Sequence, residues 1–522
     1  MDDNQDLSNL YDQITLERGK PHDFWELSAL LEVFGIRDID AQKDYGFENV
    51  FEMGKYMMRY IDTRTYKSKA LVDWENLPPL VPRVLKNYIK GLAFAMPMFV
   101  QIFFTLTIGF ALWSSITLDV ETATAVALGT FLALIVTGSA SQAIGRKGLF
   151  YLKQEEFVLA SDVTILLFNI GAAMVVIVGI ILILFNLFFN FLPNYYFFVL
   201  MAFYILLSIL FLNISIYYMF EEYMNILYFF LIGLLLTYLS HAVFGISLPF
   251  AQFVALVILD IIISIFAFLK VRRLKKGVVS EGEGNPRASI LFYSLMPFYA
   301  YGFAYFVFLT SDRIIAWSAN IEAKPYFIWF NVPYELGLDW ALISLIFMMG
   351  ATEVSIHEFM YRINDLVVQY KYNKYVDFNE KVFHFFKKFN ILYLILSVII
   401  ILLVFFIVYF VHETTNYAGV DIFFQSFTPF VYWVGAISYA FMVNGLMNVL
   451  FMFSFSRQSF SLNSIVIAAI INIIVGIIAS RIFGLEYAVL GLLVGSVAFW
   501  FVSFKYALKM FKDLEFYYYS SF

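Results

Sequence analysis

The feature that most limits how this chain can fold is a series of apolar runs that begins at residue 91. Each run holds roughly 20 residues, the length that crosses the hydrocarbon core of a bilayer as an α-helix. Only 14% of the residues are charged, against about 25% in soluble domains, so lipid must replace water around much of the chain. We expect twelve membrane-spanning helices, at residues 91–116, 122–143, 162–190, 196–219, 224–245, 248–269, 289–310, 334–355, 391–411, 428–453, 462–480 and 486–508.

The distribution of lysine and arginine supports this even number of spans. If the N-terminus lies in the cytoplasm, all but three of the 34 basic residues fall on the cytoplasmic side, as the positive-inside rule requires. The exceptions are Arg313, Lys324 and Arg481. The chain also begins with the acidic, polar residues MDDNQDL rather than a secretory signal. We therefore expect a multi-pass protein of the cytoplasmic membrane with both termini in the cytoplasm.

A change of composition divides the chain into four parts. We expect a cytoplasmic helical N-terminal region and linker at 1–88, a first six-helix half at 89–269, a cytoplasmic linker at 270–288 and a second six-helix half at 289–522. Two six-helix halves joined by a cytoplasmic loop are typical of many secondary transporters. The alternative is twelve helices that happen to be interrupted by a linker.

The N-terminal region contains two stretches with apolar residues at helical spacing. These residues are Phe24, Leu27, Leu31 and Phe34 in the first stretch, and Phe47, Val50, Phe51 and Met58 in the second. We expect a small helical domain, with an amphipathic helix on the membrane surface as the competing interpretation of either stretch.

Several classes of function are excluded or disfavoured by what the sequence lacks. The chain contains no cysteine, which rules out disulfides, thiolate metal sites and cysteine nucleophiles. It has no Walker P-loop, no His-Glu-x-x-His motif and no acidic cluster in a soluble segment large enough for a catalytic domain. A mild net charge of −6 without a long basic run gives no indication of nucleic-acid binding. We expect neither an enzyme nor a bound cofactor or metal.

A carboxyl group at bilayer depth is costly and is usually functional. Asp260 lies in ALVILDIIISIF, near the middle of the sixth span. It either lines a pathway or binds a coupling cation, or it is a protonated carboxyl that hydrogen-bonds to a neighbouring helix.

The eighth span carries acids towards both membrane surfaces. Glu335 and Asp339 are four residues apart and share one face of a helix. Glu353 follows Asp339 by fourteen residues, which at ~100° per residue returns to within about 40° of the same direction. Gly350 belongs to the same stripe. This face would suit a cavity between two bundles; alternatively, Glu335 and Glu353 are helix ends among headgroups and water.

An adjacent acid and base, Asp312 and Arg313, occur in VFLTSDRIIAWS at the outer end of the seventh span. Neighbouring residues on a helix do not face each other, so each must meet a partner on another element. Glu335 or Asp339 is the expected partner of Arg313. The pair is then either an outer gate or a solvated helix end.

Three segments within residues 309–370 resemble the PelG-type exopolysaccharide exporters, which belong to the multidrug/oligosaccharidyl-lipid/polysaccharide (MOP) flippase superfamily. In order, they are SDRIIAW, VPYELGLDWALISLIF and EVSIHEFMYRINDLVVQY. The twelve-span layout and the N-terminal extension agree with this resemblance over most of the chain.

The resemblance implies two six-helix bundles around a cavity that opens alternately to each side. It also implies a polysaccharide or lipid-linked glycan as cargo, and a cytoplasmic glycosyltransferase and other membrane components as partners. Cation antiporters of the superfamily often have an acid in the first span, where this chain has only Gln101. The alternatives are a multidrug-type cation antiporter and a non-transporting scaffold that recruits a glycosyltransferase through residues 1–88.

A glycan cargo requires hydrogen-bonding groups along its path, because sugars carry many hydroxyls. The polar residues expected to line that path are Asp312, Arg313, Glu335, Asp339 and Glu353, with Asp260 as a further candidate.

Overall fold

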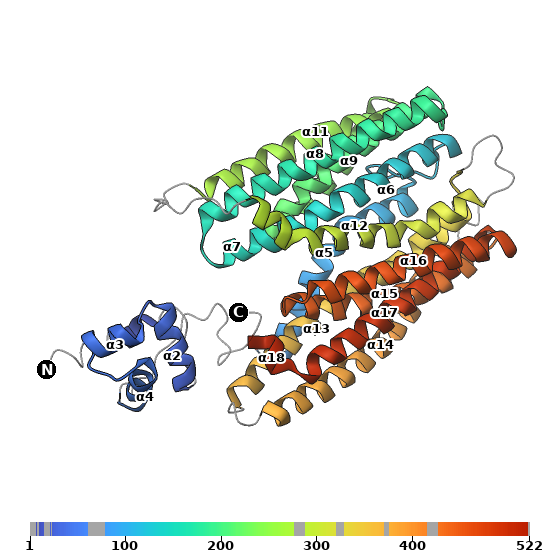
Figure 1. Cartoon of the computed structure of the whole chain (residues 1–522). Helices are drawn as coiled ribbons and strands as arrows, with labels where there is room; N and C mark the ends of the chain where they lie inside the picture. The colour runs from blue at the N-terminus through green and yellow to red at the C-terminus, as the bar shows by residue number, and fades with distance from the viewer. Residues whose placement is uncertain are drawn as a thin grey trace. The chain divides into compact units, whose positions relative to one another are not determined.

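A computed structural model describes residues 7, 10–14, 21, 23–60, 79–275, 288–319, 328–369, 375–414 and 426–519. In this part of the chain the regular elements are helices, and the only β-pairing is an isolated bridge between Phe110 and Ser115. Twelve helices are long and apolar enough to cross a membrane (Figure 1). The predicted all-α, multi-pass fold class is therefore confirmed. The chain forms two compact units, one made of Met1–Val84 with Phe359–Lys374 and the other of Leu85–Glu358 with Tyr375–Phe522.

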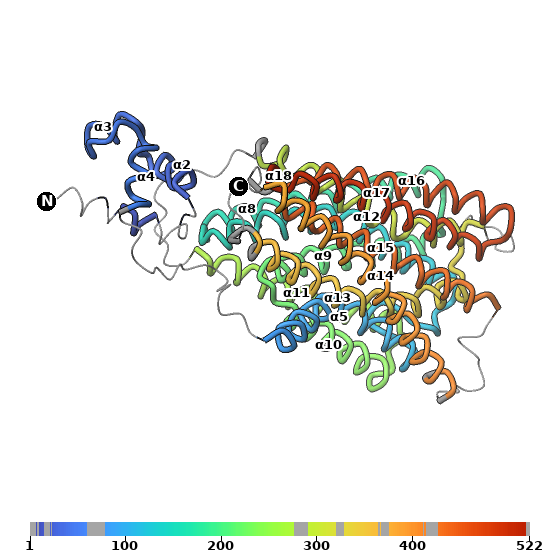
Figure 2. The backbone as a smooth tube through the Cα atoms, turned by 90° about the horizontal axis from the view of Figure 1, so that it is seen from below, coloured from blue at the N-terminus to red at the C-terminus, as the bar shows by residue number. Residues whose placement is uncertain are grey.

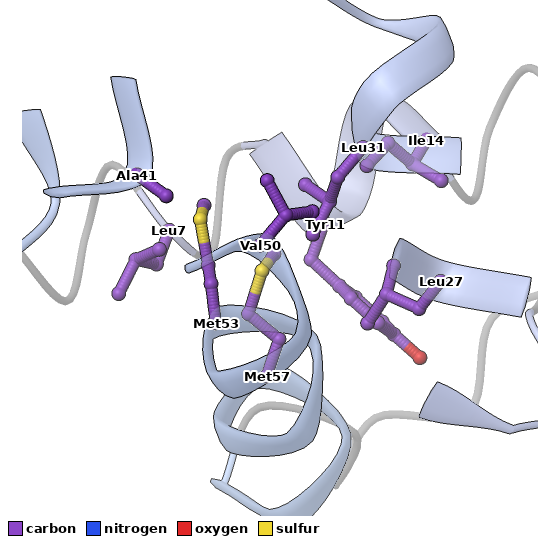
Figure 3. Packing of buried hydrophobic residues seen from close by; sticks show 9 residues of the cluster. All are labelled: Leu7, Tyr11, Ile14, Leu27, Leu31, Ala41, Val50, Met53 and Met57. Atoms are coloured by element: carbon purple, nitrogen blue, oxygen red, sulfur yellow. The ribbon is translucent and has the colours of Figure 1, made fainter. Parts of the chain in front are cut away.

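Among its described residues, the smaller unit includes the short helices α2 (Phe24–Val33), α3 (Asp38–Asp44) and α4 (Val50–Tyr60), and residues 10–14 are also helical. Figure 3 shows its buried core, in which Leu27 and Leu31 of α2 pack with residues of α4. The spacing in α4 predicted the helix but not the face that it buries. Val50, Met53 and Met57 form the buried stripe, whereas Phe51 is 40% exposed and packs against the ring of Trp25.

The first six-helix half is built around α9, which packs against α6, α8, α10 and α11. Its helices are α5 (Leu80–Ile108), α6 (Val120–Ala143), α8 (Phe157–Phe189), α9 (Asn194–Met219), α10 (Tyr223–Tyr238) and α11 (Leu248–Arg273). A π-helical turn, Ile144–Gly148, joins α6 to the short helix α7 (Leu149–Lys153), and a second, Leu239–Val243, follows α10.

In the second half, α17 packs against α15 and α16, and α16 packs against α12 (Figure 2). Its helices are α12 (Ala288–Ser318), α13 (Val332–Gln369), α14 (Tyr375–Thr414), α15 (Thr428–Ser454), α16 (Gln458–Ile482), α17 (Val489–Lys512) and the short α18 (Leu514–Tyr519).

Two helix boundaries differ from the sequence prediction in ways that matter for the site. Helix α5 begins at Leu80 rather than at residue 91, inside the expected linker. Pro82 is compatible with this early start, because the amides of the first helical turn have no partner within the helix. Helix α12 continues to Ser318 rather than ending near residue 310. Asp312 and Arg313 consequently lie within the helix and not beyond its end.

The two halves approach each other closely through glycines on two helix pairs. Where α6 meets α12, a Cβ atom added to Gly302 would lie 2.5 Å from the carbonyl oxygen of Gly138. Where α5 meets α13, a Cβ atom added to Gly91 would lie 2.9 Å from the Cα atom of Gly350. Small residues at helix crossings allow backbones to approach in this way within membranes.

We predict that Gly302→Ala destabilises the protein, because the new methyl group collides with the backbone of α6, which cannot rotate aside. Overpacking of this kind costs about 1–3 kcal/mol, measurable as a lower midpoint of thermal unfolding in detergent. Gly145→Ala is the matched control, since a Cβ atom there meets nothing within 4 Å. Equal midpoints for the two variants would contradict the close approach of α6 and α12.

Candidate functional site

The strongest concentration of buried charge in the described residues lies between α12 and α13. We refer to Asp312, Arg313, Trp317, Tyr334, Glu335 and Asp339 as the Arg313 cluster. The guanidinium group of Arg313 forms an ion pair with Glu335 and lies 3.5 Å from Oδ1 of Asp339. The indole Nε1 of Trp317 donates to the other carboxylate oxygen of Glu335 at 2.9 Å. Arg313 thus has both of the expected partners.

The spacing of these residues explains why they meet. Arg313 and Trp317 are one helical turn apart on α12, and Glu335 and Asp339 are one turn apart on α13, so each helix presents two polar groups on one face. Asp312 points in a different direction from its neighbour Arg313. Its Oδ2 atom accepts a hydrogen bond of 3.1 Å from the hydroxyl of Tyr334.

Burial makes it energetically costly to keep the side chains of this cluster charged. Asp312, Arg313 and Glu335 are all buried, whereas the Asp339 side chain is 33% exposed. Asp339 therefore forms the open edge of the cluster. Removing a charged group from water is costly unless it is paired, and three carboxyl groups here share a single guanidinium group.

The cluster has more hydrogen-bond acceptors than donors. The Oδ1 atom of Asp312 has no hydrogen-bond partner among the residues that the structure describes. Such an arrangement suits a proton, an amine or a hydroxyl group that approaches past Asp339. Within the described ranges, no group of three or more His, Asp or Glu side chains is placed to hold a metal ion.

Helices α15 and α16 support the cluster through residues that sequence reasoning did not identify. Asn472 on α16 donates to the carbonyl oxygen of Phe308 at 2.9 Å and to Oγ of Ser311 at 3.0 Å, which anchors α12 beside Asp312. Tyr439 on α15 faces Arg313. Trp317 could have been found from its position one turn after Arg313, but no sequence signal connects Asn472 or Tyr439 to this site.

Glu353 lies away from the Arg313 cluster, at the end of the bundle where α7 and α18 lie (Figure 1). We call it the basic end, because Lys153, Lys270 and Lys512 lie in the last turns of α7, α11 and α17. Lys90 on α5 lies 3.4 Å from Glu353 on α13 and 3.3 Å from Glu221, which follows α9. This network joins the first half to the second. The stripe predicted on α13 therefore serves two purposes: Glu335 and Asp339 face α12, while Gly350 and Glu353 face α5.

A second polar link also joins the halves at the basic end. Arg146, in the π-helical turn after α6, donates to the carbonyl oxygen of Phe453 near the end of α15 at 3.1 Å. Its guanidinium group also lies over the ring of Phe298 on α12, 5.8 Å from the ring centroid. A cation at a helix C-terminus is favourable because the last carbonyl groups have no partner within the helix.

Asp260 lies in the first half, on α11, and is buried among apolar residues of that half. The structure thus brings four of the six predicted residues together, namely Asp312, Arg313, Glu335 and Asp339. It places Glu353 at the contact between the halves and Asp260 in a separate helical bundle. That these residues line a transport path stays a prediction.

Solved structures with the same fold are MATE transporters. A mutant of the Vibrio cholerae MATE transporter VcmN aligns with a TM-score of 0.58 and 13% sequence identity, covering 84% of this chain and 98% of that one. An outward-facing multidrug resistance MATE family transporter of the MOP superfamily aligns with a TM-score of 0.56 and 13% identity, covering 84% and 100%. A MATE in complex with MaD5 gives 0.57 at 12% identity, covering 86% and 100%. The chain therefore has a MATE-like fold.

In contrast to the structures, sequence comparison with known families gives no match. Neither a protein-family profile nor a curated protein matches the chain.

We predict that Arg313→Gln destabilises the protein by about 3–5 kcal/mol, because it leaves Glu335 buried without its counter-charge. The double variant Arg313→Gln, Glu335→Gln should cost less than the sum of the two single changes, since it removes both charges. Unfolding in detergent, analysed as a double-mutant cycle, measures this coupling.

Arg481→Gln is the control, because Arg481 is an exposed arginine of the same half that contacts only Ser318 and Ser480 in the described structure. Its loss should change stability by less than about 0.5 kcal/mol. If Arg313→Gln costs no more than this control, the buried ion pair is not a stabilising feature of the second half.

Proposed function

We propose that this protein exports an exopolysaccharide, or its lipid-linked precursor, across the cytoplasmic membrane by alternating access. One observation carries the proposal. All six residues of the Arg313 cluster come from SDRIIAW and VPYELGLDWALISLIF, two of the segments that resemble the PelG-type exporters. The segments that indicate a glycan exporter thus supply the buried polar site of a MATE-like fold.

The chemistry of the cluster is compatible with a sugar. Carboxylates accept hydrogen bonds from sugar hydroxyls, and charge-assisted hydrogen bonds of this kind are stronger than neutral ones. Asp339 is the group that cargo would meet first, because the others are buried behind it. Arg313 would then hold Glu335 and Asp339 in place while hydroxyls exchange at the open edge.

Alternating access requires contacts between the halves that can break at one end while others persist. Helices α6 and α12 pack against each other at Gly138 and Gly302. The second contact, between α5 and α13, includes a close glycine approach, the Lys90–Glu353 ion pair and a 3.3 Å hydrogen bond from the hydroxyl of Tyr88 to the carbonyl oxygen of Phe347. We propose that opening of the basic end, which the positive-inside rule assigns to the cytoplasm, breaks this second contact.

A multidrug-type cation antiporter is the second candidate function. The excess of carboxyl groups over basic groups in the Arg313 cluster favours a cationic cargo. The first helix offers less support. Its buried polar residue is the amide Gln101, whose side-chain oxygen accepts a 3.1 Å hydrogen bond from the backbone amide of Leu112. Cooperation with a cytoplasmic glycosyltransferase belongs to the export proposal and not to the antiporter.

We predict that Asp339→Asn and Arg313→Gln each reduce polymer export at least tenfold at matched protein levels. Asp339→Asn removes the charge at the open edge of the cluster. Arg313→Gln removes the guanidinium group that holds Glu335 and Asp339 in place. Secreted polymer in producing cells, and glycan movement in liposomes holding the purified protein, measure the effect. Arg481→Gln should export normally.

Unchanged export in both site variants would refute the role of the cluster. Efflux of organic cations driven by an ion gradient, without glycan movement, would instead establish the antiporter.

We predict that a short, reducible thiol cross-linker between Lys90→Cys and Glu353→Cys stops transport, because it prevents α5 from separating from α13. The two natural side chains meet across this contact, with Nζ of Lys90 3.4 Å from Oε1 of Glu353, so a reagent with a short spacer can join cysteines at these positions. The natural chain has no cysteine, so no other thiol cross-link can form within it.

Cross-linking of the double variant should abolish export, and a reducing agent that cleaves the cross-linker should restore it. Each single-cysteine variant treated in the same way is the control. Full transport by the cross-linked protein would show that the contact between α5 and α13 stays closed throughout the cycle.

A further inference from the structure

The acid in the first half, Asp260, occupies an unusual environment. It lies midway along α11, near the centre of the membrane-spanning length, and is only 5% exposed. Ile261 and Ile265 on the same helix are 56% and 54% exposed, so the lipid-facing side of α11 points away from Asp260. The carboxyl group is therefore directed into the first helical bundle.

Neither carboxyl oxygen of Asp260 accepts a hydrogen bond from any residue that the structure describes. An ionised carboxylate in such a position is strongly destabilising unless a positive charge compensates it. In the Arg313 cluster, the guanidinium group of Arg313 supplies the positive charge that compensates the buried carboxylates. Asp260 has no comparable side chain nearby in the described bundle.

Two further side chains with oxygen atoms belong to the same part of the bundle. Ser264, which is half-buried, lies one helical turn beyond Asp260 on the same face of α11. The amide nitrogen of Asn213 on α9 donates to Oγ of Ser264 at 2.8 Å and to the carbonyl oxygen of Ile209 at 2.9 Å. This arrangement leaves the amide oxygen of Asn213 buried and without a hydrogen-bond partner among the described residues.

Charged groups on α11 and on the helices packed against it are engaged elsewhere or lie at the helix ends. Arg272 and Arg273 are exposed in the last turn of α11. At the basic end Lys270 pairs with Glu222, and Lys275 pairs with Asp162. Lys270 follows Asp260 by ten residues, or about 15 Å along the helix. At the opposite end, His241 is hydrogen-bonded to the carbonyl oxygen of Ile246 at 2.8 Å.

The remaining titratable side chains on these helices are tyrosines. Tyr228 and Tyr238 on α10 are exposed, and Tyr217 on α9 lies one turn beyond Asn213. A neutral phenol cannot balance the charge of a carboxylate. Within the described residues, the positive charge that would compensate an ionised Asp260 is therefore missing.

We propose that Asp260, Asn213 and Ser264 form a binding site for one small monovalent cation, H⁺ or Na⁺, inside the first helical half. All three residues supply oxygen atoms, the ligands that hard cations prefer. A proton or Na⁺ would supply the positive charge that the bundle lacks. The site is distinct from the Arg313 cluster, which lies in the other half and contains its own counter-charge, and its binding test does not depend on the identity of the cargo.

Thermal unfolding of the purified full-length chain in detergent tests this site. Midpoints are measured from pH 6 to pH 9, in NaCl and in choline chloride of equal ionic strength. In choline, the midpoint of the natural protein should fall as pH rises, because loss of the proton leaves a bare buried charge. If the site also takes Na⁺, added NaCl should restore the midpoint at high pH in a saturable manner. A fall that NaCl does not reverse identifies H⁺ alone as the ligand.

Three variants assign the response to this site. Asp260→Asn keeps the shape but removes the charge, so it should abolish both the pH-dependent fall and the NaCl effect. If Na⁺ binds, Asn213→Ala should raise the NaCl concentration for half-maximal stabilisation about tenfold, a loss of ~1.4 kcal/mol. Glu156→Gln, at the exposed start of α8, should behave like the natural protein.

Equal pH and NaCl dependence in the natural protein and in Asp260→Asn would overturn the proposal. Infrared absorption of the carboxyl C=O group provides a second measurement if Asp260→Asn fails to fold. A band that neither high pH nor NaCl removes would show a permanently protonated, structural carboxyl group and would likewise overturn the proposal.

Discussion

The structure depends on the absence of water from the hydrocarbon core of the bilayer. Every backbone amide and carbonyl group there must be satisfied within the protein, which leaves the helix as the available element for this chain. The same constraint acts on side chains. Glu335 can be buried because Arg313 and Trp317 both bond to it, and α12 and α13 must keep their register for those bonds to form.

Polar groups in the two halves meet this constraint in different ways. The second half contains an internal counter-charge, and Asn472 and Tyr439 from further helices complete its surroundings. The first half contains Asp260 without such a partner in the described residues. This asymmetry supports different tasks for the two halves, with cargo contact proposed for one and cation binding for the other.

The sequence predicted the twelve helices well because long apolar runs have one stable form in lipid. The ends of the helices were predicted less accurately where polar residues are part of the helix. Arg313 was expected just beyond α12 and lies inside it, because the ion pair with Glu335 lets a charged residue remain in a buried turn. The partners of Arg313 were predictable from the spacing of Glu335 and Asp339, whereas Lys90 was not predictable as the partner of Glu353. Asp339 and Glu353 are about 21 Å apart along α13, so one side of this helix meets α12 near one end and α5 near the other.

The sequence by itself determined the class of protein, the number of spans and the acids and bases that must find partners. Those properties follow from composition and from the period of the helix. Only the tertiary structure decided which helices touch, because the rotation of each helix is set by packing at contacts such as Gly91 with Gly350. That packing brought Arg313 to Glu335, placed Glu353 against Lys90 in the other half, and left the carboxyl group of Asp260 without a hydrogen-bond partner among the described residues.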